Sequence, residues 1–345
     1  MTKKITFVIP TRNNLEFLKL AINSIKYLLT KHDILILDDA STDGTKEWLA
    51  SLKDISIIIF RNEGPKRIGI VGMFDKGIEM AKTEIICAFH ADMVAGPTLD
   101  QNLLKHLSPK TVVSATRIEP PLHPEGPEKV LKDFGTEAED FSLDHFLSWS
   151  KDFIASQKDK TSTGIFAPWC MYKKDFQAVE GHDDFFAPQS KEDSDLFNRF
   201  ALNGYQFIQT WEGVVYHFTS RGSRFNKYTD GKAGQDSSEW QNTNNKNTRN
   251  FIRKWGYFVK HDQMMKPIVL PRYNIGFIVK HCTLEKLCYL EPWCDTIYID
   301  NMNLKEKYII KEQPNTLMNL QNKIKSIGTK YANYTFPGLN KLISL

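Results

Sequence analysis

An aspartate that directly follows a long apolar run is the first residue in this sequence that could do chemistry. Asp92 comes after residues 84–89, a run typical of a strand buried on both faces. In open parallel sheets, ligands bind in the crevice beyond the carboxyl ends of the strands. Asp92 is therefore a candidate ligand-binding residue, although aspartate is also a common turn former and helix cap after a strand.

Polar residues also end two other predicted strands. Thr11 to Asn13 follow the first strand, and Asp38 and Asp39 follow the second. Because the carboxyl ends of parallel strands meet at one edge of a sheet, we expect these residues to converge with Asp92. One site would then collect side chains from distant parts of the chain.

The positions of the glycines limit the ways in which this chain could bind phosphate groups. The sequence contains no Gly-x-Gly-x-x-Gly fingerprint and no Walker A motif. Phosphate groups would then have to be held through a hard cation such as Mg²⁺ or Mn²⁺, bound by one or two carboxylates. Asp92 could supply such a ligand.

Alternating strands and helices position these residues. Asn13 and Glu16 resemble a capping box at the start of the first helix, and Pro10 is expected to close the first strand. Strands joined by helices through right-handed crossovers predict a mostly parallel α/β sheet. We expect strands at residues 5–9, 34–37, 55–60, 85–89 and 112–115, and helices at residues 15–29, 45–49 and 69–82.

Composition sets the broad class. The 345 residues are 41% hydrophobic, which is enough for one large domain with an appendage or for two domains. A net charge of +4 is too small to indicate nucleic-acid binding. No apolar run reaches the roughly 20 residues of a membrane helix, so any membrane association is expected to be peripheral. Five cysteines without a Cys-x-x-Cys pair predict a reduced, cytoplasmic protein without a zinc site.

Three segments together resemble a known family. Residues 5–13, residues 37–45 (Leu-Asp-Asp-Ala-Ser-Thr-Asp-Gly-Thr) and residues 90–92 are similar to the nucleotide-diphospho-sugar glycosyltransferases of family 2, which have the GT-A fold. The second segment is the most specific. The similarity extends from about residue 5 to about residue 223. It implies a Rossmann-like sheet flanked by helices within residues 1–250, with a donor half of about 1–116 and an acceptor half of about 117–250.

The resemblance implies roles for residues at the nucleotide end of the site. Thr11 matches the residue that lines the nucleotide pocket, and Asp39 matches the aspartate that accepts a hydrogen bond from the base. Asp38 is expected to bind the nucleotide as well. Residues 73–77 depart from the family's Arg-Asn pair, and Arg67 could replace its cationic role. The expected donor is a UDP-sugar.

The resemblance also implies a metal site. Asp92 matches the last carboxylate of the family's Asp-x-Asp motif, which binds a divalent cation, Mn²⁺ or Mg²⁺, on the donor diphosphate. His90 stands where the motif has its first aspartate. His217 lies in an apolar strand, where a lone histidine is often a hydrogen-bonded core residue. The family commonly places a histidine there near the metal, so His217 is a second candidate ligand.

Two segments are candidates for the acceptor side. Glu192 and Asp193 resemble the family's Glu-Asp motif, which implies Asp193 as general base and Glu192 as a hydrogen-bond partner of the acceptor. As plain first-turn acids they could instead stabilise a helix dipole. Trp169 could stack on an acceptor sugar ring or belong to the core. The cations Arg221, Arg224 and Lys227 could close over the diphosphate or lie in solvent.

The last 95 residues carry no recognised motif. We expect a small β-α-β unit from residues 275–279, 284–290 and 296–299, and a helix around residues 317–327. Residues 251–345 thus form a small C-terminal α/β extension of unknown role.

The function implied is an inverting glycosyltransferase that moves a sugar from a nucleotide-diphosphate donor to a carbohydrate or glycoconjugate acceptor, with Asp193 as base. Two alternatives remain at this stage. A non-catalytic nucleotide-sugar or glycan binder of the same fold would fit His90 and the altered segment 73–77. A nucleotidyltransferase would need a glycine- and arginine-rich first loop, but residues 10–13 contain no glycine.

Overall fold

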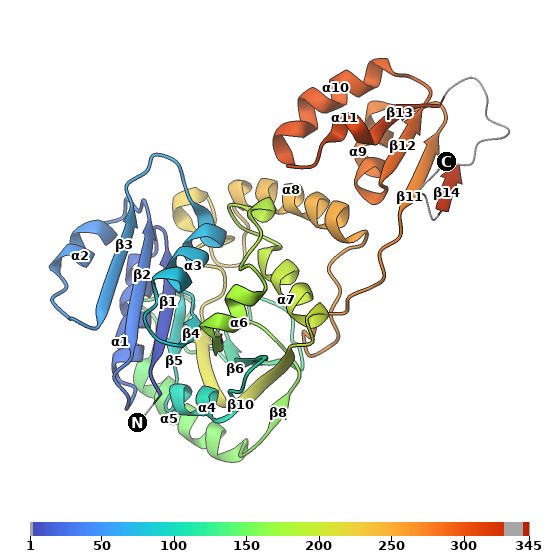
Figure 1. Cartoon of the computed structure of the whole chain (residues 1–345). Helices are drawn as coiled ribbons and strands as arrows, with labels where there is room; N and C mark the ends of the chain where they lie inside the picture. Colours follow the sequence, from blue (N-terminus) through green and yellow to red (C-terminus); the bar gives the residue numbers. More distant parts are fainter. Residues whose placement is uncertain (1–2, 328–340, 345) are drawn as a thin grey trace. The chain divides into compact units, whose positions relative to one another are not determined.

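The computed structural model describes residues 3–327 and 341–344. They divide into two compact units (Figure 1). The first unit comprises residues 1–242 and 260–268, and the second comprises residues 243–259 and 269–345. None of the described helices is long and apolar enough to cross a bilayer.

A ten-stranded sheet forms the centre of the first unit, with the order β3-β2-β1-β4-β9-β6-β10-β5 and with β7 on β6 and β8 on β10. The strands are β1 (Ile5–Thr11), β2 (Asp33–Asp39), β3 (Ile57–Asn62), β4 (Ile85–Ala88), β5 (Met93–Ala95), β6 (Thr111–Glu119), β7 (Lys129–Leu131), β8 (Thr161–Ser162), β9 (Trp169–Tyr172) and β10 (Gln206–His217). The first four strands are parallel, as predicted, whereas β9 runs antiparallel between β4 and β6. The expected α/β architecture, a mostly parallel sheet flanked by helices, is present.

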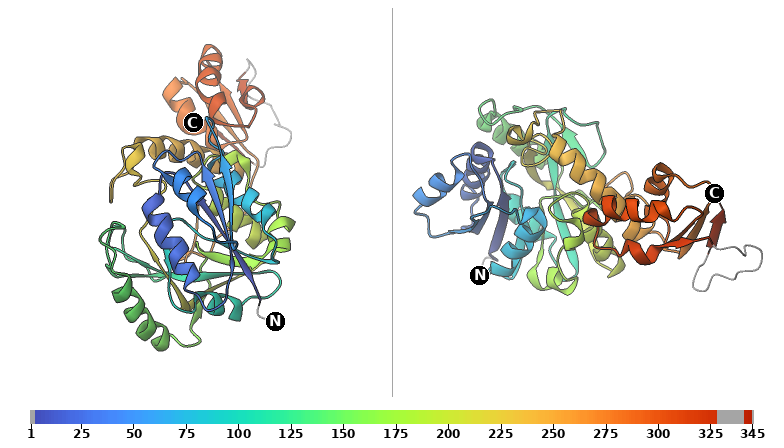
Figure 2. Two further views of the ribbon diagram at one scale, coloured as in Figure 1. Left: turned by 90° about the vertical axis from the view of Figure 1, so that its left-hand side faces the viewer. Right: turned by 90° about the horizontal axis from the view of Figure 1, so that it is seen from above.

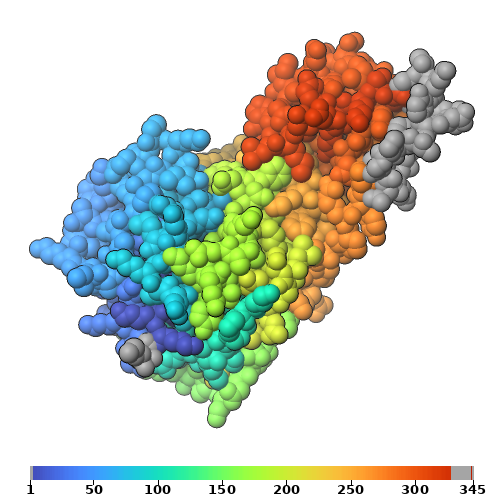
Figure 3. Space-filling model, in the orientation of Figure 1, coloured from blue at the N-terminus to red at the C-terminus, as the bar shows by residue number. Residues whose placement is uncertain are grey.

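Helices cover both faces of this sheet (Figure 2). They are α1 (Leu15–Lys26), α2 (Thr45–Ser51), α3 (Gly69–Met80), α4 (Leu99–Lys105), α5 (Leu143–Ser156), α6 (Lys173–Ala178) and α7 (Glu192–Leu202), with 3-10 turns η1 (Asp184–Phe186) and η2 (Lys227–Thr229). Helix α8 (Ser238–Trp255) begins in the first unit, and its residues from 243 onward belong to the second. The apolar sides of α1 and α3 and both faces of β1, β2 and β4 form the main core. The segment from α6 to α7 lies beside α3 at the surface (Figure 3), where the Ile70 amide donates to the Pro188 carbonyl over 2.8 Å.

The loops after β1 and β2 are held together by side chains rather than by the expected capping box. Asn13 does not cap α1, because its Oδ1 accepts from the Thr42 amide at 2.7 Å. The Leu15 amide, at the start of α1, donates instead to Asp43 Oδ2 at 2.9 Å. The Asn13 amide donates to Ser41 Oγ at 2.9 Å. The Thr42 hydroxyl also donates to Asn13 Oδ1 at 3.3 Å, so four hydrogen bonds join the two loops.

Two strand boundaries differ from the prediction in ways that shape the site. β1 continues through Pro10. Beyond residue 8 this strand pairs only with β2, so the N–H group that proline lacks is not needed for a hydrogen bond to β4. β4 ends at Ala88, and after a turn the chain enters β5, which pairs antiparallel with β10. Met93 is opposite His217 in this pairing, so Asp92 is brought to the end of β10.

The second unit contains a four-stranded parallel sheet with the order β13-β12-β11-β14. Its elements are β11 (Ile275–Val279), α9 (Leu284–Leu290), η3 (Glu291–Trp293), β12 (Thr296–Ile299), α10 (Asn303–Glu312), η4 (Gln313–Asn315), α11 (Leu320–Lys323), β13 (Ile324–Ser326) and β14 (Lys341–Ser344). The expected β-α-β unit at residues 275–299 is confirmed. The helix expected around residues 317–327 is confirmed only as the short α11, because residues 324–326 pair with β12 as a strand.

A buried ion-pair network lies inside the second unit. The side chain of Arg253 is fully buried, and its Nη2 donates to Glu291 Oε2 at 2.6 Å and to Glu312 Oε1 at 2.8 Å. Glu291 also accepts from Lys323 Nζ at 2.6 Å and from the Tyr308 hydroxyl at 2.7 Å. Burial alone raises the pKa of Glu291, but Lys323 and Arg253 outweigh it and lower the pKa to about 2.

Candidate active site

A cleft of about 160 Å³ opens at the carboxyl ends of β1, β2 and β4. Its wall includes residues from each of these strand ends and from the end of β10. The expectation that the polar strand ends converge is therefore confirmed. Among the predicted site residues, the cleft is lined by Thr11, Asp39, Arg67, Asp92 and His217.

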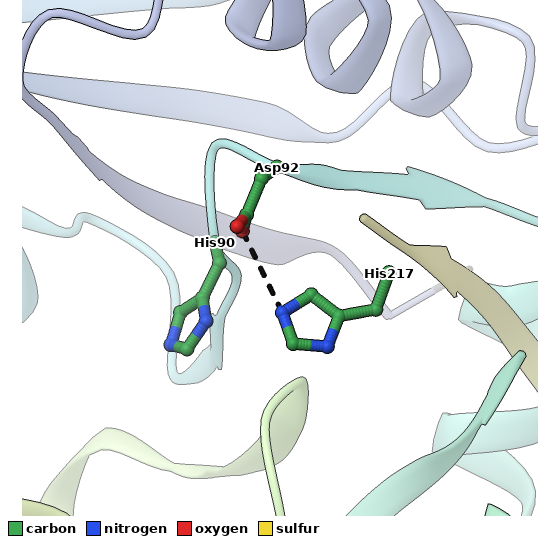
Figure 4. A group of neighbouring side chains, drawn as sticks. All are labelled: His90, Asp92 and His217. Carbon is green, nitrogen blue, oxygen red and sulfur yellow. Dashed lines mark ion pairs between the residues drawn. The ribbon is translucent and has the colours of Figure 1, made fainter. Parts of the chain in front are cut away.

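Three side chains on one wall of the cleft could hold a metal ion. One nitrogen each from His90 and His217 and a carboxylate oxygen of Asp92 lie within 4.8 Å of one another. The three side chains surround a common space (Figure 4), and His217 Nε2 lies 3.7 Å from Asp92 Oδ1. Asp92 Oδ2 accepts from the Arg221 amide at 2.7 Å, which holds the carboxylate in place.

A buried acid fixes the far side of His217. Glu119, the last residue of β6, places Oε1 at 2.9 Å from His217 Nδ1. Arg117 Nη1 and Lys129 Nζ each donate to Glu119 over 2.9 Å. Sequence reasoning missed Glu119. The sequence could have indicated Glu119, because it is an acid at the end of a buried strand, the same pattern that identified Asp92.

Burial and neighbouring charges on this wall favour the neutral form of His90 and the ionised form of Glu119. Burial lowers the pKa of His90 to about 4, although Asp92 opposes the shift. His90 is therefore neutral at physiological pH and has a free nitrogen lone pair. Burial alone raises the pKa of Glu119, but Arg117, His217 and Lys129 outweigh it and hold that pKa well below its usual value.

The opposite end of the cleft contains Thr11 and Asp39. Asp39 accepts hydrogen bonds from Asn62 Nδ2 at 2.7 Å and from the amides of Ile68 and Gly69 at 3.0 and 2.8 Å. Thr11 Oγ1 is buried and has no hydrogen-bond partner among the described residues. A buried hydroxyl without a partner is costly, so it is suited to contact a ligand.

Asp38 does not line the cleft. It is fully buried, forms an ion pair with Arg61, and its Oδ1 accepts from the Ser41 amide at 3.1 Å. The carboxylate is thus engaged in holding the loop after β2. We do not retain Asp38 among the proposed nucleotide-binding residues.

Two arginines line the cleft near Asp39 and share one carboxylate. Glu239, in the first turn of α8, bonds Arg67 and lies 3.6 Å from Arg12 Nη1. Arg67 Nε is also 3.8 Å from Asp39 Oδ2. Burial and the positive charge of Arg12 lower the pKa of Arg67, because two guanidinium groups stand close together.

The N-terminus of α7 carries the predicted acceptor-side acids. Lys191 precedes the helix in a left-handed conformation (φ 73°), and Glu192 and Asp193 occupy the first turn. Asp193 Oδ1 accepts from the Ser194 amide at 2.6 Å, and its charge is close enough to raise the pKa of His90. Burial, and then Asp193, raise the pKa of Glu192 to about 8. Glu192 is therefore mainly protonated at pH 7.

Stability should depend on the titration of Glu192. Between about pH 5 and pH 8 the folded chain holds a proton that the unfolded chain, with a pKa of 4.5, has released. Wild-type stability should therefore fall as the pH rises through this window, by about 1.4 kcal/mol per unit of pKa difference at most. Glu192→Gln cannot titrate, so its free energy of unfolding relative to wild type should rise from pH 5 to pH 8. Urea unfolding at both pH values measures this difference.

The control for this prediction is Glu47→Gln, which changes an exposed glutamate in the first turn of α2. Its stability difference from wild type should be the same at both pH values. A constant offset for Glu192→Gln as well would show that burial does not shift the Glu192 equilibrium.

Trp169 is a core residue. It is 4% exposed, its indole stacks on Phe176 with ring centroids 6.0 Å apart, and Phe200 packs edge-on against it. A buried indole presents no face to a sugar. Of the two roles considered from the sequence, the structure supports the core, and Trp169 is not retained in the proposed site.

The arginines after β10 stabilise their own loop. Arg221 is buried, with Nη1 at 3.0 Å from Glu137 Oε1, and Arg224 Nε lies 2.8 Å from Asp236 Oδ1. The Arg224 guanidinium also lies 4.5 Å from the centre of the Trp240 ring. Both cations are therefore paired with acids of the first unit, and neither lines the cleft, although Arg224 stays 33% exposed. The loop itself contributes Ser220, Gly222 and Ser223 to the cleft wall.

Residues 6–176 match the family model of glycosyl transferase family 2. The matched segment is 171 of the 345 residues, just under half of the chain. It begins in β1 and ends in α6, so it includes Thr11, Asp39 and Asp92. It ends before α7 and before His217.

Solved structures of several transferases are similar to this chain at low identity. GalNAc-T7, determined with UDP, GalNAc and Mn²⁺, is 13% identical (TM-score 0.46), with 62% of this chain and 43% of that chain covered. The mannosyltransferase PcManGT from Pyrobaculum calidifontis, determined with GDP-Man and Mn²⁺, is 17% identical (TM-score 0.48), with coverages of 78% and 68%. Residues 1–349 of S. aureus TarS with UDP are 11% identical (TM-score 0.46), with coverages of 72% and 80%. The chain thus spans less than half of GalNAc-T7. No curated protein matches its sequence.

Proposed function

We propose that this chain transfers a sugar from a nucleotide-diphosphate donor to a carbohydrate or glycoconjugate hydroxyl with inversion at the anomeric carbon. One observation carries the proposal. His90, Asp92 and His217 place three metal-binding atoms within 4.8 Å of one another, in the same cleft as Thr11 and Asp39. A metal-diphosphate site and a nucleoside site would then lie in one cleft of the first unit.

The donor atoms of the metal group fit Mn²⁺ better than Mg²⁺. Two imidazole nitrogens and one carboxylate oxygen suit a transition metal, whereas Mg²⁺ prefers oxygen ligands and keeps several waters. His90 is neutral at physiological pH, as a ligand must be. Bound there, the cation would neutralise negative charge on the departing diphosphate.

The other end of the cleft is suited to the nucleoside. Thr11 Oγ1 can form a hydrogen bond with the donor without losing one inside the protein. Asp39 is acceptor-only when ionised, so it favours bases with an N–H group at the recognised edge, such as uracil or guanine. We infer a UDP-sugar or GDP-sugar as the donor class.

Asp193 is the proposed general base. It lies in the first turn of α7 and close enough to His90 to affect its pKa. From there Asp193 would take the proton of the acceptor hydroxyl as that oxygen attacks the anomeric carbon. Glu192, protonated at pH 7, could donate a hydrogen bond to the acceptor. A single displacement of this kind inverts the anomeric centre.

Thermal shifts with nucleotide-sugars test the proposed function. The full chain would be heated with UDP-, GDP-, dTDP- or CMP-sugars, each with Mn²⁺, Mg²⁺ or EDTA, and stabilising donors would be assayed for hydrolysis. A ligand at a hundred times its dissociation constant adds roughly 2.7 kcal/mol. We expect Mn²⁺-dependent stabilisation with slow hydrolysis, both lost in Asp92→Ala. Stabilisation of Asp92→Ala equal to wild type in Mn²⁺ would contradict the metal site, and a lack of response to every nucleotide would contradict the function.

Removing Glu239 should strengthen donor binding. Its carboxylate neutralises Arg12 and Arg67 at the cleft wall. In Glu239→Gln both guanidinium groups are free to attract the anionic donor, so its dissociation constant should fall roughly three- to tenfold, equivalent to about 1 kcal/mol. Isothermal titration at low and high salt measures this, and the gain should shrink in high salt. Glu63→Gln, which removes an exposed carboxylate paired with Lys46, is the control and should leave the affinity unchanged.

A further inference from the structure

We propose that Glu119 is a positioning residue that selects the tautomer of His217 and thereby presents the Nε2 lone pair to the metal beside Asp92. This inference rests on the proposed function, because it concerns the same cation site. It concerns a residue that binds neither metal nor substrate.

The contact between Glu119 and His217 determines which ring nitrogen carries hydrogen. Glu119 Oε1 lies 2.9 Å from Nδ1, which is hydrogen-bond distance. An ionised carboxylate can only accept, so Nδ1 must donate and therefore carries the hydrogen. In a neutral imidazole, Nε2 is then the nitrogen with the lone pair.

The free nitrogen points at the other ligands. His217 Nε2 lies 3.7 Å from Asp92 Oδ1, which is too long for a hydrogen bond. Two ligands that each lie about 2.1 Å from one ion can be separated by up to about 4.2 Å, so this distance fits a shared cation. Glu119, His217 and the cation would form the carboxylate–histidine–metal arrangement found at many metal sites.

Glu119 is itself rigidly held. It is 1% exposed, and Arg117 and Lys129 each donate to it over 2.9 Å. The Arg117 guanidinium lies 3.8 Å from the centre of the Phe166 ring, and its second arm donates to Glu128 at 3.2 Å. Glu119 therefore cannot swing away from His217, and the imidazole orientation is set before any cation binds.

Glu119→Gln is the variant that tests this role. The amide keeps the size of the side chain but can offer an N–H to Nδ1, which would favour the tautomer whose Nε2 is blocked by hydrogen. Titration of the full chain with Mn²⁺ alone, followed by electron paramagnetic resonance, should show 10- to 100-fold weaker binding than wild type. Glu128→Gln is the matched control, because it removes a carboxylate from the same Arg117 without touching His217. It should bind Mn²⁺ like wild type.

A second measurement needs neither a variant nor a metal. Long-range ¹H–¹⁵N NMR of the metal-free wild-type chain should show His217 with hydrogen on Nδ1, whereas hydrogen on Nε2 would overturn the proposal even if Glu119→Gln fails to fold. Equal Mn²⁺ affinity of Glu119→Gln and wild type would overturn the positioning role alone. Absence of Mn²⁺ binding by wild type would instead contradict the proposed function.

Discussion

Asp193→Asn should slow sugar transfer by roughly 10²- to 10⁴-fold, the usual contribution of a general base. Asparagine has nearly the same shape but cannot take the acceptor proton. Because the proposed metal and nucleoside contacts come from other residues, the affinities for donor and Mn²⁺ should stay nearly unchanged. Steady-state transfer rates and isothermal titration of the donor provide the two measurements.

Asp195→Asn is the matched control for this prediction. Asp195 belongs to the same first turn of α7 but is buried and pairs with Arg199 at 2.9 Å. Its replacement should lower stability while transfer by the folded protein continues. A loss of donor binding in Asp193→Asn, or equal loss of transfer in both variants, would show that Asp193 has a structural role.

Arg253→Met should destabilise the second unit by about 3 to 5 kcal/mol. The substitution removes a fully buried cation and leaves Glu291 and Glu312 in the interior without their main shared partner. Lys323 and Tyr308 still contact Glu291 but cannot replace the bonds to Glu312. Hydrogen exchange of amides in β11 and β12, measured by mass spectrometry on the full chain, reports the stability of this unit.

Arg249→Met is the control for the effect of burial, because it removes a cation that is more exposed than Arg253. Arg249 pairs with the same Glu312 at 2.8 Å, but 32% of its side chain is exposed. Its loss should cost only about 1 kcal/mol, because a partly exposed pair gains little over water. Similar exchange rates in the two variants would mean that the network contributes no more than ordinary surface pairs.

The parts of the fold that depend on local pattern were predictable. β1, β2 and the strand of residues 275–279 are short apolar runs between turn residues, so the sequence alone locates them and orders them in a parallel sheet. From this order, the convergence of Thr11, Asp39 and Asp92 follows. The cleft could thus be placed before any side chain was seen.

The predictions that differ from the structure concern features that depend on interactions between residues far apart in the sequence. Asn13 and Glu16 have capping-box spacing, but Asp43 binds the first amide of α1 from another loop. Residues 324–326 become a strand only because β12 offers a partner. Trp169 is apolar in either role, and only the packing of Phe176 distinguishes them. Glu119 meets His217 across 98 positions of sequence, a contact that no local motif encodes.

The bonds that join the loops after β1 and β2 have a consequence for the thermodynamics of donor binding. Through Asn13, Ser41 and Asp43, these loops are already fixed relative to each other on the side of the cleft where Thr11 and Asp39 are proposed to contact the nucleoside. Binding there should lose little conformational entropy, since preorganised contacts need no further ordering. The unfavourable entropy of binding should therefore arise mainly from immobilising the donor rather than from ordering these loops. Shortening the Asp43 side chain would loosen the loops and add an entropy loss at the nucleoside end.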